Sequence, residues 1–100
     1  MPRFIVAGEA ENDIVDIAQY LKSLDLKAAV NFIDELYAAN ALLADSPALG
    51  HRRDDLTTRP VRFWTVMSRY MIVYRATTPI EVVRVLSGRR DVAQILRRGH

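Results

Sequence analysis

The chain has 100 residues, half of them hydrophobic and about a quarter charged, a composition typical of one soluble globular domain. It has no cysteine, which excludes disulfides and thiolate metal sites, and no apolar run near the ~20 residues of a membrane helix. The net charge of +2 hides a division between the two halves. Residues 1–50 carry three basic and eight acidic side chains, whereas residues 51–100 carry eleven arginines and four acids. We therefore expect one cytoplasmic domain over 1–100 whose second half meets an acidic partner, unless its arginines merely face solvent.

The first half predicts one strand and two helices. Residues 3–8 are short and apolar and end at a glycine, which is typical of a strand. Residues 9–24 place apolar side chains at helical spacing, with acids in the first turn where the helix dipole favours them. Asp25 is a candidate N-cap for a second helix over about 26–44. The linker is so short that the two helices must form an antiparallel hairpin.

The second half predicts a sheet. Residues 45–60 hold two prolines, a glycine and paired charges, which indicates an irregular connection. Residues 61–67, 70–76 and 80–87 are rich in β-branched and aromatic side chains and are separated by short polar breaks, which predicts an antiparallel three-stranded meander. Residues 89–98 predict a short basic helix.

The expected architecture is α+β: a first strand, a helical hairpin, a three-stranded meander and a short C-terminal helix. The first strand must join the sheet of the meander. The hairpin must cover one face of that sheet to bury its apolar stripes, and we expect the other face to stay comparatively open.

Arginines inside strands are the first candidate functional residues. Arg62 and Arg84 have apolar neighbours, and a buried unpaired cation is costly, so each must face solvent or find a carboxylate. We expect both on the open face, beside Arg52, Arg53 and the Arg89–Arg90 pair. The alternative is a structural pairing of Arg62 or Arg84 with one of the nearby acids Asp54, Asp55, Glu81 and Asp91.

Aromatic side chains are the second group. Tyr70 and Tyr74 share one face of a strand with Ile72 and are expected in the core. Trp64 could pack against the core, stack on a base or anchor a protein partner. The only histidines are His51 and His100, and no spacing matches a known metal motif, so we expect no metal and no cofactor.

Several segments, in this order, resemble the RelE/ParE toxins along nearly the whole chain. The matching pieces are A-x-x-D-I-x-D-I-A-x-Y-L from Ala10 to Leu21 and A-x-x-F-I-D-E-L from Ala29 to Leu36. They continue with L-A-x-x-P-x-L-G-x-x-R-x-D-L over 43–56 and R-F-W…Y-M-I-V-Y-R over 62–75. The most telling piece is E-V-V-R-V-L-S-G-R-R-D-V over 81–92.

The resemblance implies a toxin that is neutralised by a cognate antitoxin and that has one of two activities. RelE-like members cut mRNA in the ribosomal A site, whereas ParE-like members are understood to poison DNA gyrase. RelE-like enzymes use lysines and arginines around the sheet and a tyrosine near the C-terminus. Here Arg62 and Arg84 match family arginines, but the segment just before the sheet has His51, Arg52 and Arg53 and no lysine, and Leu96 stands at the tyrosine position. A leucine cannot donate a proton, and arginine is too basic to exchange one readily, so a nuclease would depend on His51.

The residues and the resemblance together favour a non-enzymatic ParE-like toxin with no catalytic residue of its own. The expected partners are DNA gyrase and a ParD-like antitoxin with a ribbon–helix–helix fold, which would bind operator DNA in place of this chain and form a hetero-oligomer with it. Alternatives are a ribosome-dependent mRNA endonuclease and a member with no active target. The target-contact candidates are Arg62, Arg84, Arg89 and Arg90, and the antitoxin-contact candidates are Tyr20, Tyr37 and Trp64.

Overall fold

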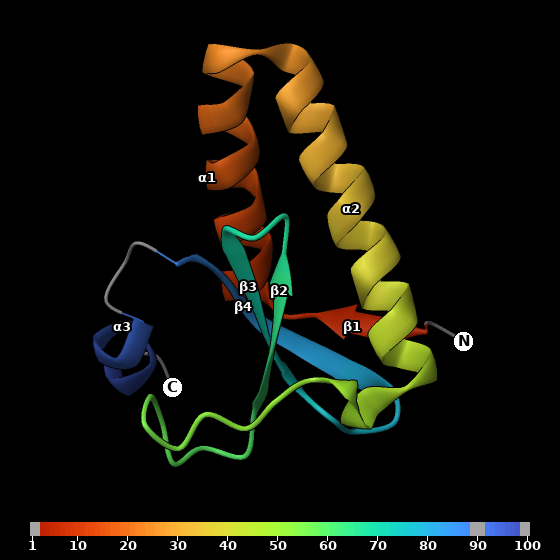
Figure 1. The fold of residues 1–100 in the computed structure, drawn as a ribbon, viewed down its shortest axis with the longest axis vertical. Coiled ribbons are helices and arrows are strands. Elements are labelled where there is room, and N and C mark those ends of the chain that lie inside the picture. The colour runs from red at the N-terminus through yellow and green to blue at the C-terminus, as the bar shows by residue number, and fades with distance from the viewer. Residues whose placement is uncertain (1–2, 89–91, 99–100) are drawn as a thin grey trace.

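The computed structural model describes residues 3–88 and 92–98, and these form the predicted α+β architecture. In chain order the elements are β1 (Phe4–Val6), α1 (Gly8–Leu24), α2 (Leu26–Asp45), a 3-10 turn (Pro47–Leu49), β2 (Arg62–Val66), β3 (Tyr70–Arg75), β4 (Ile80–Ser87) and α3 (Val92–Arg98). The helices α1 and α2 form an antiparallel hairpin that rises above the sheet (Figure 1). Asp25 caps α2 as predicted, because its carboxylate accepts a hydrogen bond from the Lys27 N–H at 3.0 Å.

The sheet has four strands in the order β1-β4-β3-β2. The strands β2, β3 and β4 form the predicted antiparallel meander, whereas β1 pairs with β4 in parallel, so the sheet is mixed. A helical hairpin separates β1 from the other strands, and such a long crossover allows parallel pairing. Because β1 pairs only with residues 80–82, the edge of β4 beyond Val82 has no strand beside it among the described residues.

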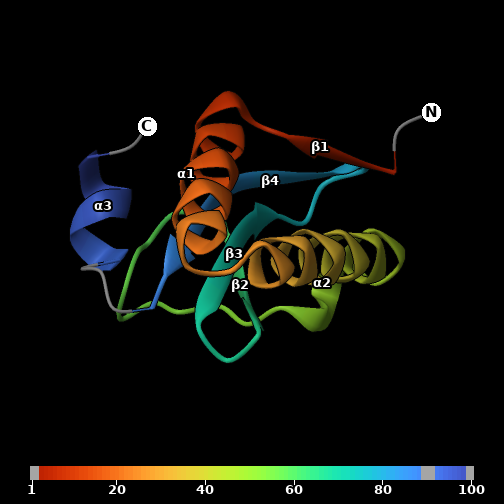
Figure 2. The ribbon, with the colours of Figure 1, turned by 90° about the horizontal axis from the view of Figure 1, so that it is seen from above.

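The helix-face cluster is the larger of two buried clusters and fills the space between the hairpin and the sheet (Figure 2). From the helices it takes Phe32 and Leu43, and from the sheet it takes the predicted core residues Tyr70, Ile72 and Tyr74. Phe32 and Tyr70 meet edge to face with ring centroids 5.0 Å apart, a favourable aromatic geometry. Its buried members are Ala10, Leu21, Ala29, Phe32, Leu36, Leu43, Val66, Tyr70, Ile72, Tyr74, Ile80, Val82 and Val85.

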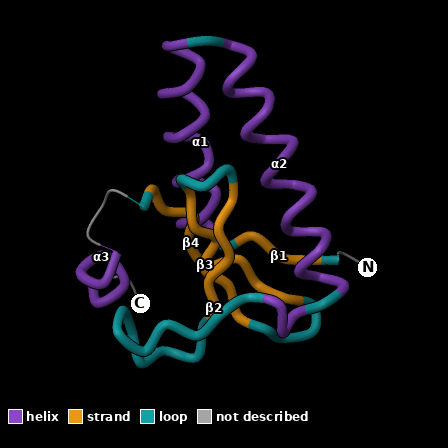
Figure 3. Tube along the Cα trace, in the orientation of Figure 1, coloured by secondary structure: helices purple, strands orange, loops and turns teal. Residues whose placement is uncertain are grey.

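The opposite face of the sheet is covered, and the prediction of an open face was wrong. The connection between α2 and β2 runs beside α3 before it returns to the sheet (Figure 3). Together they bury the second-face cluster, which consists of Val61, Phe63, Val73, Leu86, Val92 and Leu96. These apolar strand residues alternate with those of the helix-face cluster, so both faces of the meander need a cover. No described helix is both long and apolar enough to cross a membrane.

Candidate functional site

The hairpin exposes a long apolar surface, which we call the hairpin surface. On α2 the exposed residues Leu26, Val30, Ile33 and Tyr37 recur at spacings of four, three and four, so they lie along one side of the helix. This stripe runs next to the buried stripe that includes Phe32. A contiguous apolar stripe outside the core marks a docking surface for another protein. With the exposed residues of α1, the hairpin surface comprises Val15, Tyr20, Leu24, Leu26, Val30, Ile33, Tyr37 and Leu42.

The hairpin that carries this surface is acidic. The segment from Gly8 to Asp45 carries eight acidic residues and only two lysines, Lys22 and Lys27. The negative charge of the first half is therefore carried by the hairpin itself. An apolar surface within an acidic field favours a partner segment that is both apolar and basic.

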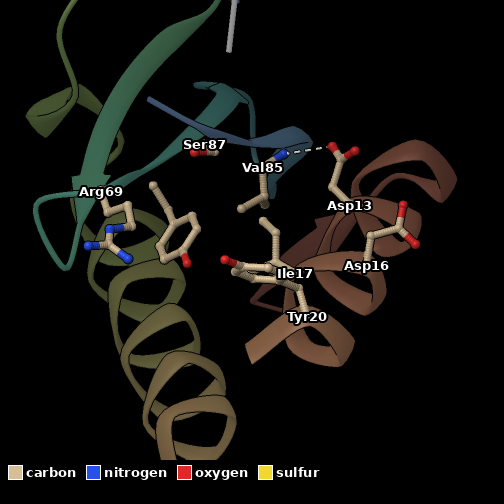
Figure 4. Close-up of a pocket in the computed structure, with 8 residues that line it drawn as sticks. Asp13, Asp16, Ile17, Tyr20, Arg69, Val85 and Ser87 are labelled. Carbon is tan, nitrogen blue, oxygen red and sulfur yellow. Dashed lines mark hydrogen bonds between the residues drawn. The ribbon is translucent and has the colours of Figure 1, made fainter. Parts of the chain in front are cut away.

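Tyr20 borders a groove of 360 Å³ between α1 and the ends of β3 and β4 (Figure 4). Tyr20 is 62% exposed, and its ring lies beside Ile17, across the groove from Arg69. The groove is large enough for an apolar side chain of a partner. The full lining is Asp13, Asp16, Ile17, Tyr20, Arg69, Tyr70, Val85 and Ser87.

Tyr37 and Trp64, the other two antitoxin-contact candidates, have different surroundings. Tyr37 is 65% exposed, and its ring meets Phe4 of β1 edge to face at 5.7 Å. Trp64 is partly buried against the helix-face cluster, as the packing interpretation expects, and also lines a groove beside α2. The structure therefore brings Tyr20 and Tyr37 to the surface of the hairpin and places Trp64 at the edge of the sheet.

Arg84 is held by acidic residues of α1. Its Nε and Nη2 donate to the two oxygens of Asp13 at 2.7 and 3.0 Å, and its Nη1 lies 3.5 Å from Glu9. The hydrogen bonds to Asp13 raise the pKa of the Arg84 guanidinium above its usual value, so it stays charged. Arg84 lies on the second face of the sheet, across the ladder from Val73. It is paired with carboxylates, as the structural alternative expected, but they are not the four acids near the sheet that the sequence suggested.

Asp13 also bonds to the sheet. Its Oδ2 accepts from the Val85 N–H at 3.0 Å, which satisfies a backbone donor on the part of β4 that no described strand accompanies. One carboxylate thus joins α1 to both the backbone and the side chains of β4. Sequence analysis missed Asp13, although a signal exists: it is an acid at the helical spacing of Ala10 and Ile17, on the buried side of α1.

Arg62 lies on the hairpin side of the sheet, so its predicted position on the open face was wrong. It pairs across the ladder with Tyr74, which belongs to the helix-face cluster, and its Nη1 donates to the Gly50 carbonyl at 2.8 Å. Tyr74 donates its hydroxyl to the Pro47 carbonyl at 2.6 Å and accepts from the Gly50 N–H at 2.8 Å. Burial raises the pKa of the Tyr74 phenol. Arg62 and Tyr74 therefore fasten the loop after α2 to the sheet.

The remaining candidate positions bear on catalysis. Leu96, at the tyrosine position of RelE-like enzymes, is buried in the second-face cluster, and its carbonyl accepts from Arg59 at 3.2 Å. His51 has an exposed side chain, while its backbone pairs with Phe63. Arg89 and Arg90 lie outside the described residues. Over 3–88 and 92–98, no three histidine, aspartate or glutamate side chains gather as a metal site would require.

The fold and these surfaces define a small α+β protein-binding module. Its helical hairpin presents an acidic, apolar face, and its sheet arginines are used as structural anchors. The chain belongs to the ParE toxin family of type II toxin–antitoxin systems (parDE), whose sequence pattern it matches over residues 4–92. Membership implies an antitoxin as a partner. No curated protein matches the chain.

Proposed function

We propose that this toxin inhibits DNA gyrase by protein–protein contact and that a ParD-like antitoxin neutralises it by covering the hairpin surface. The observation that carries the antitoxin part is the exposed stripe Leu26, Val30, Ile33 and Tyr37 within an acidic hairpin. An amphipathic segment with basic flanks would bury this stripe and meet its charge. Gyrase acts in the cytoplasm, so the proposal keeps the toxin there.

The proposal that gyrase is the target rests on what the family resemblance implies. It is supported by the buried leucine at position 96. A buried leucine there offers no proton to a phosphodiester, and the arginines near the sheet are poor acid–base groups at neutral pH. Arg89 and Arg90 remain the predicted target contacts. In this proposal Arg62 and Arg84 act indirectly, by holding the loop after α2 and helix α1 against the sheet.

The target is tested with purified toxin, gyrase and supercoiled plasmid. We expect linear, protein-linked DNA, with none when the antitoxin is added first. The double variant Arg89→Ala/Arg90→Ala should lose this product, whereas the matched pair Arg52→Ala/Arg53→Ala should retain it. Transcript cleavage on translating ribosomes, with gyrase unaffected, would show that the toxin is an mRNA endonuclease instead. Normal colony growth when the toxin is expressed without antitoxin would show that it has no active target.

The antitoxin-binding surface is tested by substituting exposed residues of the hairpin, which leaves the core intact. Tyr37→Ala should weaken antitoxin binding by about tenfold, because exposed aromatic anchors account for much of the binding energy of such interfaces. Asn31→Ala, on the same helix but outside the stripe, is the control and should bind normally. Calorimetric titration gives both constants. Equal affinities of the antitoxin for wild type and Tyr37→Ala would show that the antitoxin binds elsewhere than on this stripe.

A further inference from the structure

The strand β2 is an edge strand that is only partly covered. The backbone of Phe63 pairs outward with His51 through two hydrogen bonds of 2.8 and 2.9 Å. In an antiparallel ladder, residues two apart direct their backbone groups to the same side, so Thr65 also points its N–H and C=O outward. No described strand or bridge lies beside Thr65 on that side. A free pair of backbone groups on an edge is a template for another strand.

An apolar groove of 250 Å³ lies beside this edge on the hairpin side of the sheet. Its walls are α2 and the end of β2, and two of its apolar side chains, Leu42 and Met67, are 45% and 46% exposed. Glu35 is its one acidic residue. The lining is Glu35, Ala38, Ala39, Leu42, Trp64, Thr65, Val66 and Met67, so the groove suits an apolar side chain.

A second groove, of 470 Å³, lies on the other face of the sheet, and Thr65 borders both. This second groove contains two arginines and two hydroxyl side chains beside apolar residues: its lining is Arg53, Leu56, Thr65, Ser68, Arg69, Met71, Gly88, Val92 and Ala93. Arg53 is already held by both oxygens of Asp55, at 3.0 and 2.9 Å. Arg69 is exposed and has no side-chain partner among residues 3–88 and 92–98. The second groove therefore offers one free positive charge.

The turn between β2 and β3 holds these features in place. Met67 and Ser68 have φ values of 56° and 55°, in the left-handed region that non-glycine residues rarely adopt. The Arg69 N–H donates to the Val66 carbonyl at 3.2 Å, and the Arg69 carbonyl accepts from Gly88 at 2.8 Å. The backbone at Arg69 is thus fixed on both sides, and its side chain borders both the second groove and the groove beside Tyr20. A prearranged contact of this kind lowers the cost of binding.

We propose that the free edge of β2 accepts an extended segment of a partner protein as a fifth strand, in which apolar and acidic residues alternate. Side chains of a strand alternate between the two faces of a sheet. An apolar residue of the added strand would enter the groove beside α2, and its acidic neighbour would face Arg69. Main-chain hydrogen bonds to Thr65 supply affinity, and the two unlike grooves select the sequence. This surface does not include the stripe Leu26, Val30, Ile33 and Tyr37, although it shares Leu42 with the hairpin surface, and it does not depend on gyrase being the target.

The test uses two synthetic peptides, each seven residues long and blocked at both ends. In one glutamate and valine alternate, and in the other lysine and valine alternate. Trp64 is the only tryptophan of the chain and lines the apolar groove, so its fluorescence reports occupation directly. We expect the glutamate–valine peptide to shift the emission with saturation, and the lysine–valine peptide to bind about tenfold more weakly.

Charge reversal makes the test specific. Arg69→Glu should invert the preference between the two peptides, whereas Arg97→Glu, an exposed arginine on α3, should leave it unchanged. Both variants should melt like wild type, because neither arginine side chain has a hydrogen-bond or ion-pair partner within residues 3–88 and 92–98. A second reporter is the Thr65 amide resonance, which should move on binding because a new hydrogen bond forms there. Absence of saturable binding, equal binding of both peptides, or an unchanged preference in Arg69→Glu would each overturn the proposal.

Discussion

The two faces of the sheet are covered in very different ways. On one face, helices of 17 and 20 residues bury the helix-face cluster, which includes seven aromatic or aliphatic side chains from the meander alone. On the other face, α3 has seven residues and is fastened mainly by Val92 and Leu96 over the second-face cluster. A seven-residue helix is not stable by itself, so α3 depends wholly on this docking. The hairpin face is therefore the folding core, and the second face is a thinner cover whose loss the protein should tolerate better.

The largest effect is expected at Phe32, which is fully buried and contacts Tyr70 across the helix-face cluster. Phe32→Ala should lower the free energy of unfolding by about 3–5 kcal/mol, because it leaves a cavity in the folding core. Urea unfolding followed by circular dichroism measures this loss. The neighbouring Ile33→Ala is the control, since Ile33 is exposed and should cost little. Comparable losses for both variants would contradict the assignment of this face as the core.

Gly50 tests how tightly the loop after α2 is held against the helix-face cluster. A Cβ at this position would overlap the ring and hydroxyl of Tyr74, with Cε1 at only 2.6 Å. Gly50→Ala should therefore cost up to about 3 kcal/mol, since Tyr74 is fully buried and cannot move aside. Gly8→Ala is the matched control, because a Cβ there meets nothing within 4 Å. Thermal unfolding of the two variants gives the difference, and equal melting temperatures would show that the loop can shift.

Leu96 lies in the second-face cluster, which α3 covers, and its substitution tests how much this cover contributes to stability. Leu96→Ala should cost about 2 kcal/mol, at the low end for a buried leucine, because α3 can undock without unfolding the hairpin face. Hydrogen exchange should show the amides of α3 losing protection while those of α1, α2 and β3 retain most of theirs. Arg97→Ala, on an exposed side of the same helix, should change neither. A uniform loss of protection through the chain would mean that the two faces unfold as one unit.

The smallest effect concerns alkaline pH. Burial raises the pKa of Tyr74 above its usual value near 10, so the folded state holds its phenol uncharged while the unfolded chain begins to ionise it. The stabilisation is complete below pH ~10 and is lost as the pH rises through the folded-state pKa. The urea midpoint of the wild type should fall more steeply above pH ~10 than that of Tyr74→Phe. Tyr37→Phe, which removes an exposed phenol, should follow the wild type.

Local sequence patterns were sufficient to predict most of the helices and strands. The strand over Ile80–Ser87 and the start of the second helix at Leu26 match the predicted bounds, and the first helix begins one residue earlier than expected. Periodicities of 3.6 and 2.0 and an aspartate at an N-cap depend on neighbours in the chain, so they can be read without the fold. The same applies to Tyr70, Ile72 and Tyr74, whose alternation alone placed them in the core.

Only the tertiary structure determined which groups the arginines bind and which segments cover the second face of the sheet. Asp13 and Arg84 are 71 positions apart, and Arg62 meets the carbonyl of Gly50 rather than a nearby acid. The parallel pairing of β1 and the cover formed by α3 also join distant segments. A charged side chain takes whichever partner the packed elements bring within hydrogen-bond distance, and sequence separation carries no information about that. The amino-acid pattern therefore determined which elements form and which residues are apolar. Only the packing decided which arginines became anchors and which, like Arg69, have no side-chain partner in the described part of the chain.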